Sequence, residues 1–310
     1  MTAAWEPIAR CWICDGTSLT DVHDAVFDLS AYGAQDPELA AYSGSRVAIA
    51  RCARCGFAQP ASLPALPRYF DRMYDQRWSR DWIVREHGAS YKDLIFDDVL
   101  RALAVRVDGS ARRLLDVGAH AGRFVAAARR AGWDAEGLEL NPSTAAYAAA
   151  VSGGIVHQGN VHSFDVPAPR FDAVTLTDVL EHVPDPRTVL RRVLRFLVPG
   201  GWIAIKVPNA PAQRIKEQVK ARVRPGYRPS IADNLVHVNH FSPRSLRIAL
   251  EREGYASVSV IPAAPELDEG AGASAPGSLL RRGAFALARV IPGGVHTPLA
   301  FHLQAYARRP

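Results

Sequence analysis

LLDVGAHAGRF, from Leu114 to Phe124, decides the fold of this 310-residue chain. An apolar run ends at Asp116, Gly118 follows two residues later, and a helical pattern comes next. A buried strand, a tight turn and a helix in this order are typical of an α/β protein with a parallel sheet. Ligands of such sheets bind where the strands end, so the turn is a candidate ligand site.

The residues of the turn indicate the kind of ligand. A dinucleotide-binding turn needs GxGxxG, so that bare backbone and a helix N-terminus can approach a pyrophosphate. Here His120 and Arg123 stand at the second and third glycine positions. The carboxylate of Asp116 would repel phosphate, but it would attract an ammonium group or accept a hydrogen bond from a hydroxyl. The turn therefore favours a cationic, hydroxylated ligand.

Further strand ends follow at regular distances. WDAEGLEL ends a second strand near Glu139, twenty-three residues after Asp116, which is close to the spacing of a ribose-binding acid. FDAVTLTDVLEHVPDP, residues 171–186, leads from an apolar strand into an acidic loop, and LVPGGWIAIKVPN, residues 197–209, contains a glycine turn and another strand. Taken singly, Asp116 could cap the following helix and Glu139 could be a solvated strand end.

Together these motifs resemble those of class I S-adenosylmethionine (SAM) methyltransferases over residues 112–261. The resemblance implies a three-layer, Rossmann-like sandwich with a seven-stranded sheet of order 3-2-1-4-5-7-6, and a SAM-binding domain over residues 109–263. It places the first glycine turn around the methionine part of SAM, Glu139 at the ribose, Asn160 at the adenine and Thr177 with Asp178 beneath the sulfonium. The implied SAM-binding residues in this domain are Asp116, Gly118, Ala119, Gly122, Glu139, Leu140, Asn160, Val161, Thr177 and Asp178. His120 departs from the family's central glycine.

The cysteines form two CxxC pairs, Cys11 with Cys14 and Cys52 with Cys55, and no other cysteine is present. Four thiolates at this spacing suit one tetrahedral Zn²⁺, and a site closed by four protein ligands is structural. The alternative is a set of redox-active or incidental thiols. We therefore predict a zinc-binding lobe over residues 1–60.

The segment after the second pair, FAQPASLPALPRYFDRMYDQRW, resembles the zinc-bearing subgroup of sugar and cell-surface glycan methyltransferases. The resemblance implies a helical lid over residues 61–108, with Tyr74 and Trp78 over the SAM site. The alternative is that these aromatic residues pack in the core.

Methyl transfer to a hydroxyl needs a base, and a neutral imidazole suits this role near pH 7. Three of the ten histidines stand in suitable loops: His182 in LEHVPDP, and His237 and His240 in NLVHVNHFSPRSL. The resemblance to sugar methyltransferases assigns the base to His237, although Val236 replaces the acid that precedes it in that subgroup. Glu181 and His182 are the second candidates, and His240 is expected to be structural.

Composition bounds the remaining possibilities. The net charge is +6, but 33 of the basic residues are Arg and 4 are Lys, a skew more typical of genome composition than of nucleic-acid binding. Within residues 209–240 lies a basic insert, QRIKEQVKARVRPGYR, which either meets solvent or covers the diphosphate of a nucleotide-linked substrate.

The N-terminus has no signal-peptide pattern, and no apolar run is long enough for a transmembrane helix, so a cytoplasmic enzyme is expected.

The last segment, residues 264–310, is predicted to contain a linker, a basic amphipathic helix in SLLRRGAFALARVI, and a final antiparallel strand. The helix either packs on the sheet or contacts an anionic membrane.

The sequence thus predicts a SAM-dependent methyltransferase acting on a hydroxyl of a sugar nucleotide, glycan or glycosylated natural product. The alternatives are an RNA or protein methyltransferase whose zinc lobe recognises the substrate, and a SAM-binding or zinc-scaffolded partner protein without turnover.

Overall fold

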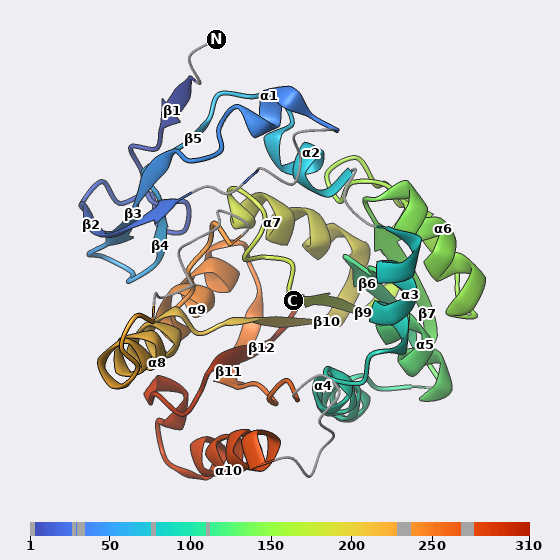
Figure 1. Ribbon diagram of the computed structural model, residues 1–310. Coiled ribbons are helices and arrows are strands. Elements are labelled where there is room, and N and C mark those ends of the chain that lie inside the picture. Colours follow the sequence, from blue (N-terminus) through green and yellow to red (C-terminus); the bar gives the residue numbers. More distant parts are fainter. Residues whose placement is uncertain are drawn as a thin grey trace.

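The computed structural model describes residues 4–26, 29, 35–75, 79–109, 112–227, 237–267 and 276–310. Figure 1 shows a small N-terminal lobe of antiparallel strands beside a larger part built on one sheet. A helical segment runs between the two parts.

The large sheet has seven strands in the order β8-β7-β6-β9-β10-β12-β11. Numbered within the sheet, this is 3-2-1-4-5-7-6, so the predicted fold is confirmed. The first five strands are parallel, whereas β12 runs antiparallel to both of its neighbours. The strands are β6 (Arg113–Val117), β7 (Asp134–Glu139), β8 (Val156–Gln158), β9 (Phe171–Thr177), β10 (Leu197–Pro208), β11 (Ala256–Pro262) and β12 (His302–Arg308).

Helices cover both faces of this sheet because the central strands carry apolar residues on both faces. On one face, residues of α4 (Asp93–Arg106) and α5 (Arg123–Arg130) pack against Leu114 and Ala173. On the other, residues of α7 (Pro186–Phe196) and α9 (Pro243–Arg252) pack against Leu115 and Val174. The remaining helices of this part are α6 (Pro142–Val151), α8 (Ala210–Val223), α10 (Pro276–Val290) and a short 3₁₀ turn (Gly294–His296).

The N-terminal lobe consists of two small antiparallel sheets. One pairs β1 (Trp5–Pro7) with β5 (Ser62–Pro64), and the other has the order β2 (Leu19–Val26), β3 (Arg46–Cys52), β4 (Ala58–Pro60), with α1 (Pro37–Ala40) beside them. The lobe is joined to the large part through a two-way backbone pairing of Ala58 with His240: each N–H donates to the other carbonyl, at 3.2 and 2.9 Å. Val238 also packs in the lobe's core.

The segment between the two parts is helical, with α2 (Tyr69–Asp75), α3 (Arg80–Gly88) and then α4. It is fastened beside the carboxyl ends of β6 and β7. The side chain of Asn141 donates to the Tyr74 carbonyl at 2.9 Å, and Arg123 makes two-pronged contacts with Asp93 at 2.6 to 3.0 Å. Trp78, predicted to lie over the SAM site, falls outside the described residues. No helix among the described residues is both long enough and apolar enough to cross a membrane.

Candidate functional site

The turn between β6 and α5 depends on glycine at two positions. Gly118 and Gly122 both have φ of +76°. An added Cβ would lie 2.5 Å from a Val179 methyl at Gly118 and 2.9 Å from the Ala148 Cβ at Gly122, so larger residues are excluded. His120 also adopts a left-handed conformation, with φ of +50°, and its N–H donates to Glu139 at 2.8 Å. The turn therefore holds His120, where the family has a glycine, through a backbone hydrogen bond to Glu139.

The two predicted acids lie beside this turn. Asp116 is buried and accepts a hydrogen bond of 2.6 Å from the Thr175 hydroxyl, and burial raises its pKa to about 7. Glu139 accepts from the N–H groups of His120 and Asn141, and burial raises its pKa as well. Each carboxylate oxygen has a second lone pair, so these acids can still accept hydrogen bonds from a ligand. Ala119 is buried beside the turn, and its Cβ would clash with any side chain at Gly137.

Other residues predicted to bind SAM lie on the neighbouring strand ends. Asn160 donates to Asp71 of α2 at 2.8 Å and accepts from the His162 N–H at 2.9 Å, so it fastens the helical segment. Leu140 follows β7, where its carbonyl accepts from Gln158, and Val161 packs partly buried against the core. Thr177 ends β9.

Asp178, the residue after β9, is held by two lysines. It has φ of +57°, and its carboxylate contacts Lys92 at 2.7 Å and Lys206 at 2.5 Å. Lys206 is fully buried and also contacts Glu266 at 2.6 Å. Burial alone would raise the pKa of Asp178, but the charges of Lys206 and Lys92 hold it well below its usual range. Sequence reasoning missed both lysines and Glu266, although a lysine inside the apolar strand WIAIKVP is a signal that could have identified Lys206.

The three candidate base residues come together next to Asp178. The ring centroids of His182 and His237 are 4.6 Å apart, and the Tyr74 hydroxyl lies 2.8 Å from Nδ1 of His182. A carboxylate oxygen of Glu181 lies within 4.8 Å of a ring nitrogen of each histidine. The His237 side chain is partly open to solvent, yet desolvation by the groups around it and the nearby His182 lower its pKa, so its imidazole is neutral near pH 7. Burial and Asp178 raise the pKa of Glu181 well above its usual range.

Asn239 connects the two loops that carry these residues. Its side-chain amide donates to the carbonyls of Leu180 and Val183, at 2.6 and 2.5 Å, and its N–H donates to the Glu181 carbonyl at 3.0 Å. His240 is buried and pairs with Ala58 through its backbone, in agreement with a structural role. Sequence reasoning did not single out Asn239.

The four cysteines form one buried cluster. Their sulfur atoms all lie within 4.8 Å of one another, with Cys11 to Cys55 and Cys14 to Cys52 both at 3.5 Å, and none is in a disulfide. Zn–S bonds of about 2.3 Å in a tetrahedron place sulfur atoms about 3.8 Å apart. The arrangement therefore fits one structural zinc ion.

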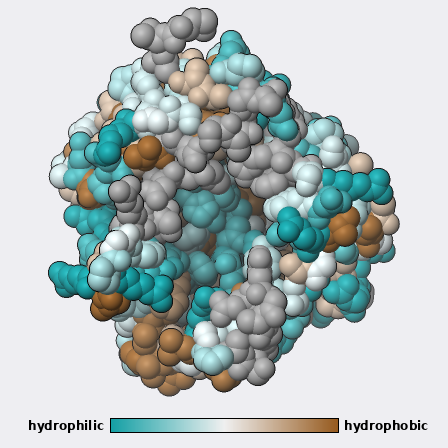
Figure 2. Space-filling view, viewed as in Figure 1, coloured by the Kyte–Doolittle hydropathy of each residue, from teal (hydrophilic) through white to brown (hydrophobic). Residues whose placement is uncertain are grey.

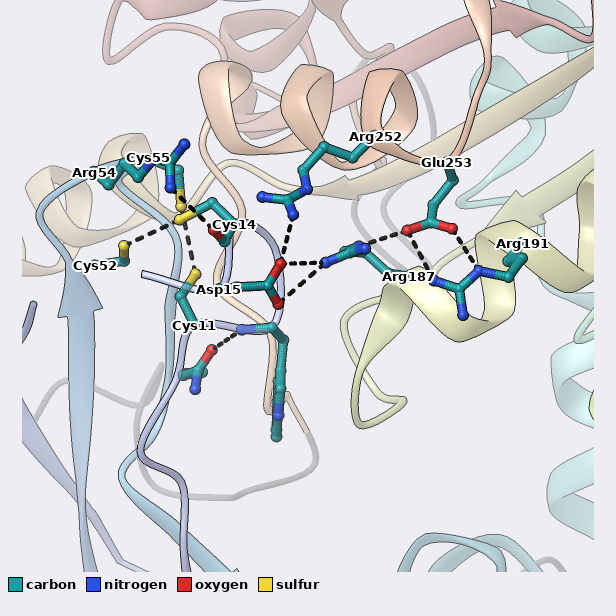
Figure 3. A network of polar contacts seen from close by, with 12 residues as sticks. Cys11, Cys14, Asp15, Cys52, Arg54, Cys55, Arg187, Arg191, Arg252 and Glu253 are labelled. Carbon is teal, nitrogen blue, oxygen red and sulfur yellow. Dashed lines mark hydrogen bonds and ion pairs between the residues drawn. The ribbon is translucent and has the colours of Figure 1, made fainter. Parts of the chain in front are cut away.

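The first knuckle is connected to the large part by charged side chains (Figure 3). Asp15 contacts Arg187 of α7 at 3.1 Å and Arg252, at the end of α9, at 2.5 Å. Arg187 and Arg191 in turn contact the buried carboxylate of Glu253, at 2.5 and 2.8 Å. The cysteine cluster is thus connected to α7 and α9, the helices that follow the loops of His182 and His237.

Known proteins share the large part of this chain. Residues 86–260, more than half of the chain, match the family described as a methyltransferase domain. The ubiquinone biosynthesis O-methyltransferase of Paracidovorax citrulli is 33% identical over 118 residues, which cover 34% of this chain and 50% of that protein. That of Bordetella avium is 34% identical over 106 residues, covering 32% and 43%. The chain spans about half the length of the curated relatives it matches.

Two solved structures show the same fold at low identity. A chain of the complex between the Haloferax volcanii Trm112 methyltransferase activator and a methyltransferase is 16% identical, with a TM-score of 0.53 over 79% of this chain and 100% of that one. Phosphoethanolamine N-methyltransferase 2 of Haemonchus contortus, in complex with S-adenosyl-L-methionine, is 14% identical, with a TM-score of 0.50 over 82% of this chain and 63% of that one. The chain therefore belongs to the methyltransferase domain family and contains a SAM-dependent methyltransferase domain.

Proposed function

We propose that this protein transfers the methyl group of SAM to a hydroxyl of a sugar nucleotide, a glycan or a glycosylated natural product, with His237 as general base. The observation that carries the proposal is the cluster of hydrogen-bonding side chains beside the end of β9. His182 contacts both the Tyr74 hydroxyl and the His237 ring, and the ion pair of Asp178 with Lys92 lies close to His237. Such a set suits an acceptor with several hydroxyl groups.

The surface agrees with a polar acceptor. Figure 2 shows a hollow near the middle of this face, over the region where Figure 1 places β9 and β10, with hydrophilic residues at its floor. An acceptor that was mainly apolar would be expected to meet apolar and aromatic walls.

In the proposed reaction, bound SAM supplies an electrophilic methyl group. Asp116 and Glu139 would hold the ammonium and ribose ends of the cofactor, and the glycine turn would admit its methionine part. The acceptor oxygen approaches in line with the methyl carbon and the sulfur; the new O–C bond forms as the S–C bond breaks. His237 takes the hydroxyl proton, since its imidazole is neutral near pH 7 and has a free nitrogen lone pair. Tyr74 contacts the neighbouring His182 through its hydroxyl, and the His182 ring lies edge-on against His237, which would orient the base.

The basic insert gives little support to the idea that the acceptor carries a diphosphate. In α8, Lys220 contacts Glu217 at 3.2 Å and the Tyr227 hydroxyl at 3.4 Å, so part of its charge is already neutralised. Residues 228–236 of the insert fall outside the described part of the chain. We therefore propose a hydroxylated acceptor without assigning a diphosphate to α8.

A second candidate is methylation of a phenolic hydroxyl. It is favoured by the matched relatives, which are named ubiquinone biosynthesis O-methyltransferases. The same base and the same transfer geometry would serve such an acceptor, whose hydroxyl loses its proton more easily than that of a sugar.

The deciding experiment measures S-adenosylhomocysteine formation with two acceptor panels, nucleotide sugars and glycosides in one and catechols and other phenols in the other. The proposal expects turnover with the first panel and its loss in His237→Ala. Turnover confined to phenols would favour the second candidate. SAM binding without product from either panel would contradict both.

A further inference from the structure

Helix α10 exposes its apolar side to solvent. Leu279, Leu280, Leu287 and Val290 are all exposed, Leu280 and Val290 by 76% and 81%. Their spacing places them on one face of the helix, together with Gly283 and Ala286. The fully buried residues of this helix are small, Ser278 and Ala288. The amphipathic helix expected from the sequence thus presents to solvent the side that a core helix would bury.

A second apolar stripe lies on α8. Ile215, Val219 and Val223 are spaced one turn apart and are all exposed, Val223 by 67%. Figure 1 places α8 and α10 in the same lower part of the molecule, and the charge of Arg281 on α10 is, after burial and Lys220, one of the causes that lower the pKa of Lys216 on α8. Figure 2 shows hydrophobic surface at the lower edge of the molecule, where Figure 1 places α8 and α10.

Basic residues flank both stripes. α10 contains no acidic residue, and the one acid of α8, Glu217, is buried and bonded to Lys220 and Tyr227. Arg222, Arg224 and Arg282 form no ion pair with any residue that the structure describes. We call the exposed side chains of residues 215–224 and 279–291 the apolar–basic face.

We propose that the apolar–basic face docks on an anionic phospholipid membrane, with its leucine and valine side chains in the headgroup–acyl boundary and its arginines against lipid phosphates. Charge complementarity favours this occupant. A second copy of the chain would add its own arginines, and no acid of this face, to the same interface, so like charges would gather there without partners. An apolar face with basic flanks and few acids is the pattern by which amphipathic helices bind to a membrane surface without crossing it.

The test is co-sedimentation of the full chain with vesicles. One set is pure phosphatidylcholine, and the other contains equal parts of phosphatidylcholine and phosphatidylglycerol. We expect binding to the anionic vesicles that weakens as salt is raised, because exposed charges are screened. Leu280→Ser with Leu287→Ser should weaken binding by at least about tenfold, since both side chains would leave the lipid. Arg222→Gln with Arg282→Gln should weaken binding to the anionic vesicles alone.

Ile155→Ser is the matched control. Ile155 is equally exposed, at 62%, but it precedes β8 at the opposite edge of the sheet, so its vesicle binding should equal that of the wild type. Circular dichroism and SAM titration of every variant establish that the fold is retained.

Three outcomes would overturn the proposal: no binding of the wild type to either vesicle, equal binding of the wild type and the double-leucine variant, or a wild-type dimer that this variant converts to monomer. The measurement does not depend on turnover, so its result stands apart from the proposed function.

Discussion

Burial sets the protonation states of single residues at the site. It raises the pKa of the fully buried Asp116 to about 7, and desolvation together with the nearby His182 lowers the pKa of His237, whose side chain is partly exposed. The two shifts have the same physical origin, because a buried group favours its neutral form. Their consequences differ: Asp116 changes charge near neutral pH, whereas His237 stays neutral over the whole working range.

His237→Ala is expected to lower kcat by about tenfold or more and to leave the SAM dissociation constant unchanged, as for loss of a general base. Because the pKa of His237 is about 3, the wild-type rate should not fall through protonation of this residue until the pH is far below neutral. Steady-state kinetics and SAM titration measure both quantities. His162→Ala, an exposed histidine of the loop after β8, is the control. An unaltered kcat in His237→Ala would remove this residue from the mechanism.

SAM affinity is expected to depend on pH through Asp116. Below its raised pKa of about 7 the carboxyl is protonated and no longer attracts the ammonium group of SAM. If only the carboxylate form binds, the affinity should be about tenfold higher at pH 8 than at pH 6. Calorimetric titration at both pH values tests this, with Asp116→Asn expected to be weak and independent of pH. Asp134→Asn, on a largely exposed side chain at the start of β7, should behave as the wild type.

Contacts between elements complete the site. Lys206 lies within β10, but its ammonium reaches Asp178 after β9 and Glu266 after β11. Asn239 joins the loop before α9 to the loop before α7. The candidate base is therefore positioned by residues from several strands and helices, none of them adjacent in sequence.

Lys206→Met should lower the free energy of unfolding by about 1–3 kcal/mol, because it leaves the partly buried carboxylates of Asp178 and Glu266 without their shared cation. Lys92 would still contact Asp178, so the larger loss falls on Glu266. Urea denaturation measures the change. Lys216→Met removes a lysine from the half-buried surface of α8 and should cost less than about 1 kcal/mol. A Lys206→Met variant as stable as the wild type would show that the ion pairs contribute little.

At the scale of the whole molecule, the N-terminal lobe supports the loop that carries the candidate base. The Ala58–His240 pairing and the contacts of Asp15 with Arg187 and Arg252 connect the lobe to the large part. Most of the residues predicted to bind SAM lie instead at the ends of β6, β7 and β9, within the large sheet, although Asn160 and Val161 follow β8 and Tyr74 lies on α2. Loss of the lobe should therefore lower turnover, which depends on the loop of His237, more than it weakens SAM binding at the ends of the large sheet's strands.

Removal of zinc with a chelator, or Cys14→Ser, is expected to lower Tm and kcat while SAM binding is largely retained. Folding of such a lobe depends on its metal. Metal analysis, thermal unfolding and SAM titration check the three parts of this prediction. Asp15→Ala is the control for the metal, because it keeps all four thiolates and should retain zinc. SAM binding lost together with zinc would contradict the separation of the two sides.

Much of the fold was predictable because it depends on local pattern. Apolar strands followed by tight turns predicted the parallel strands, and LAFHLQAYARR predicted the antiparallel β12. The spacing of the cysteines predicted their cluster, and His182, His237 and Glu181 were predicted as candidates that the structure brings together. The limits of the proposed domains and the binding roles of the individual residues stay predictions.

The sequence by itself determined the strand order, through its resemblance to a known family, and the positions of the cysteine pairs and of the glycine turn, because these depend on residue type and spacing along the chain. Only the tertiary structure decided which groups meet across long distances in sequence: Lys206 with Glu266, Tyr74 with His182, and Asp15 with Arg252. It also decided which side of α10 faces solvent, since periodicity shows that a helix has an apolar face but not what covers that face. Such contacts depend on the packing of whole elements, which no local pattern specifies.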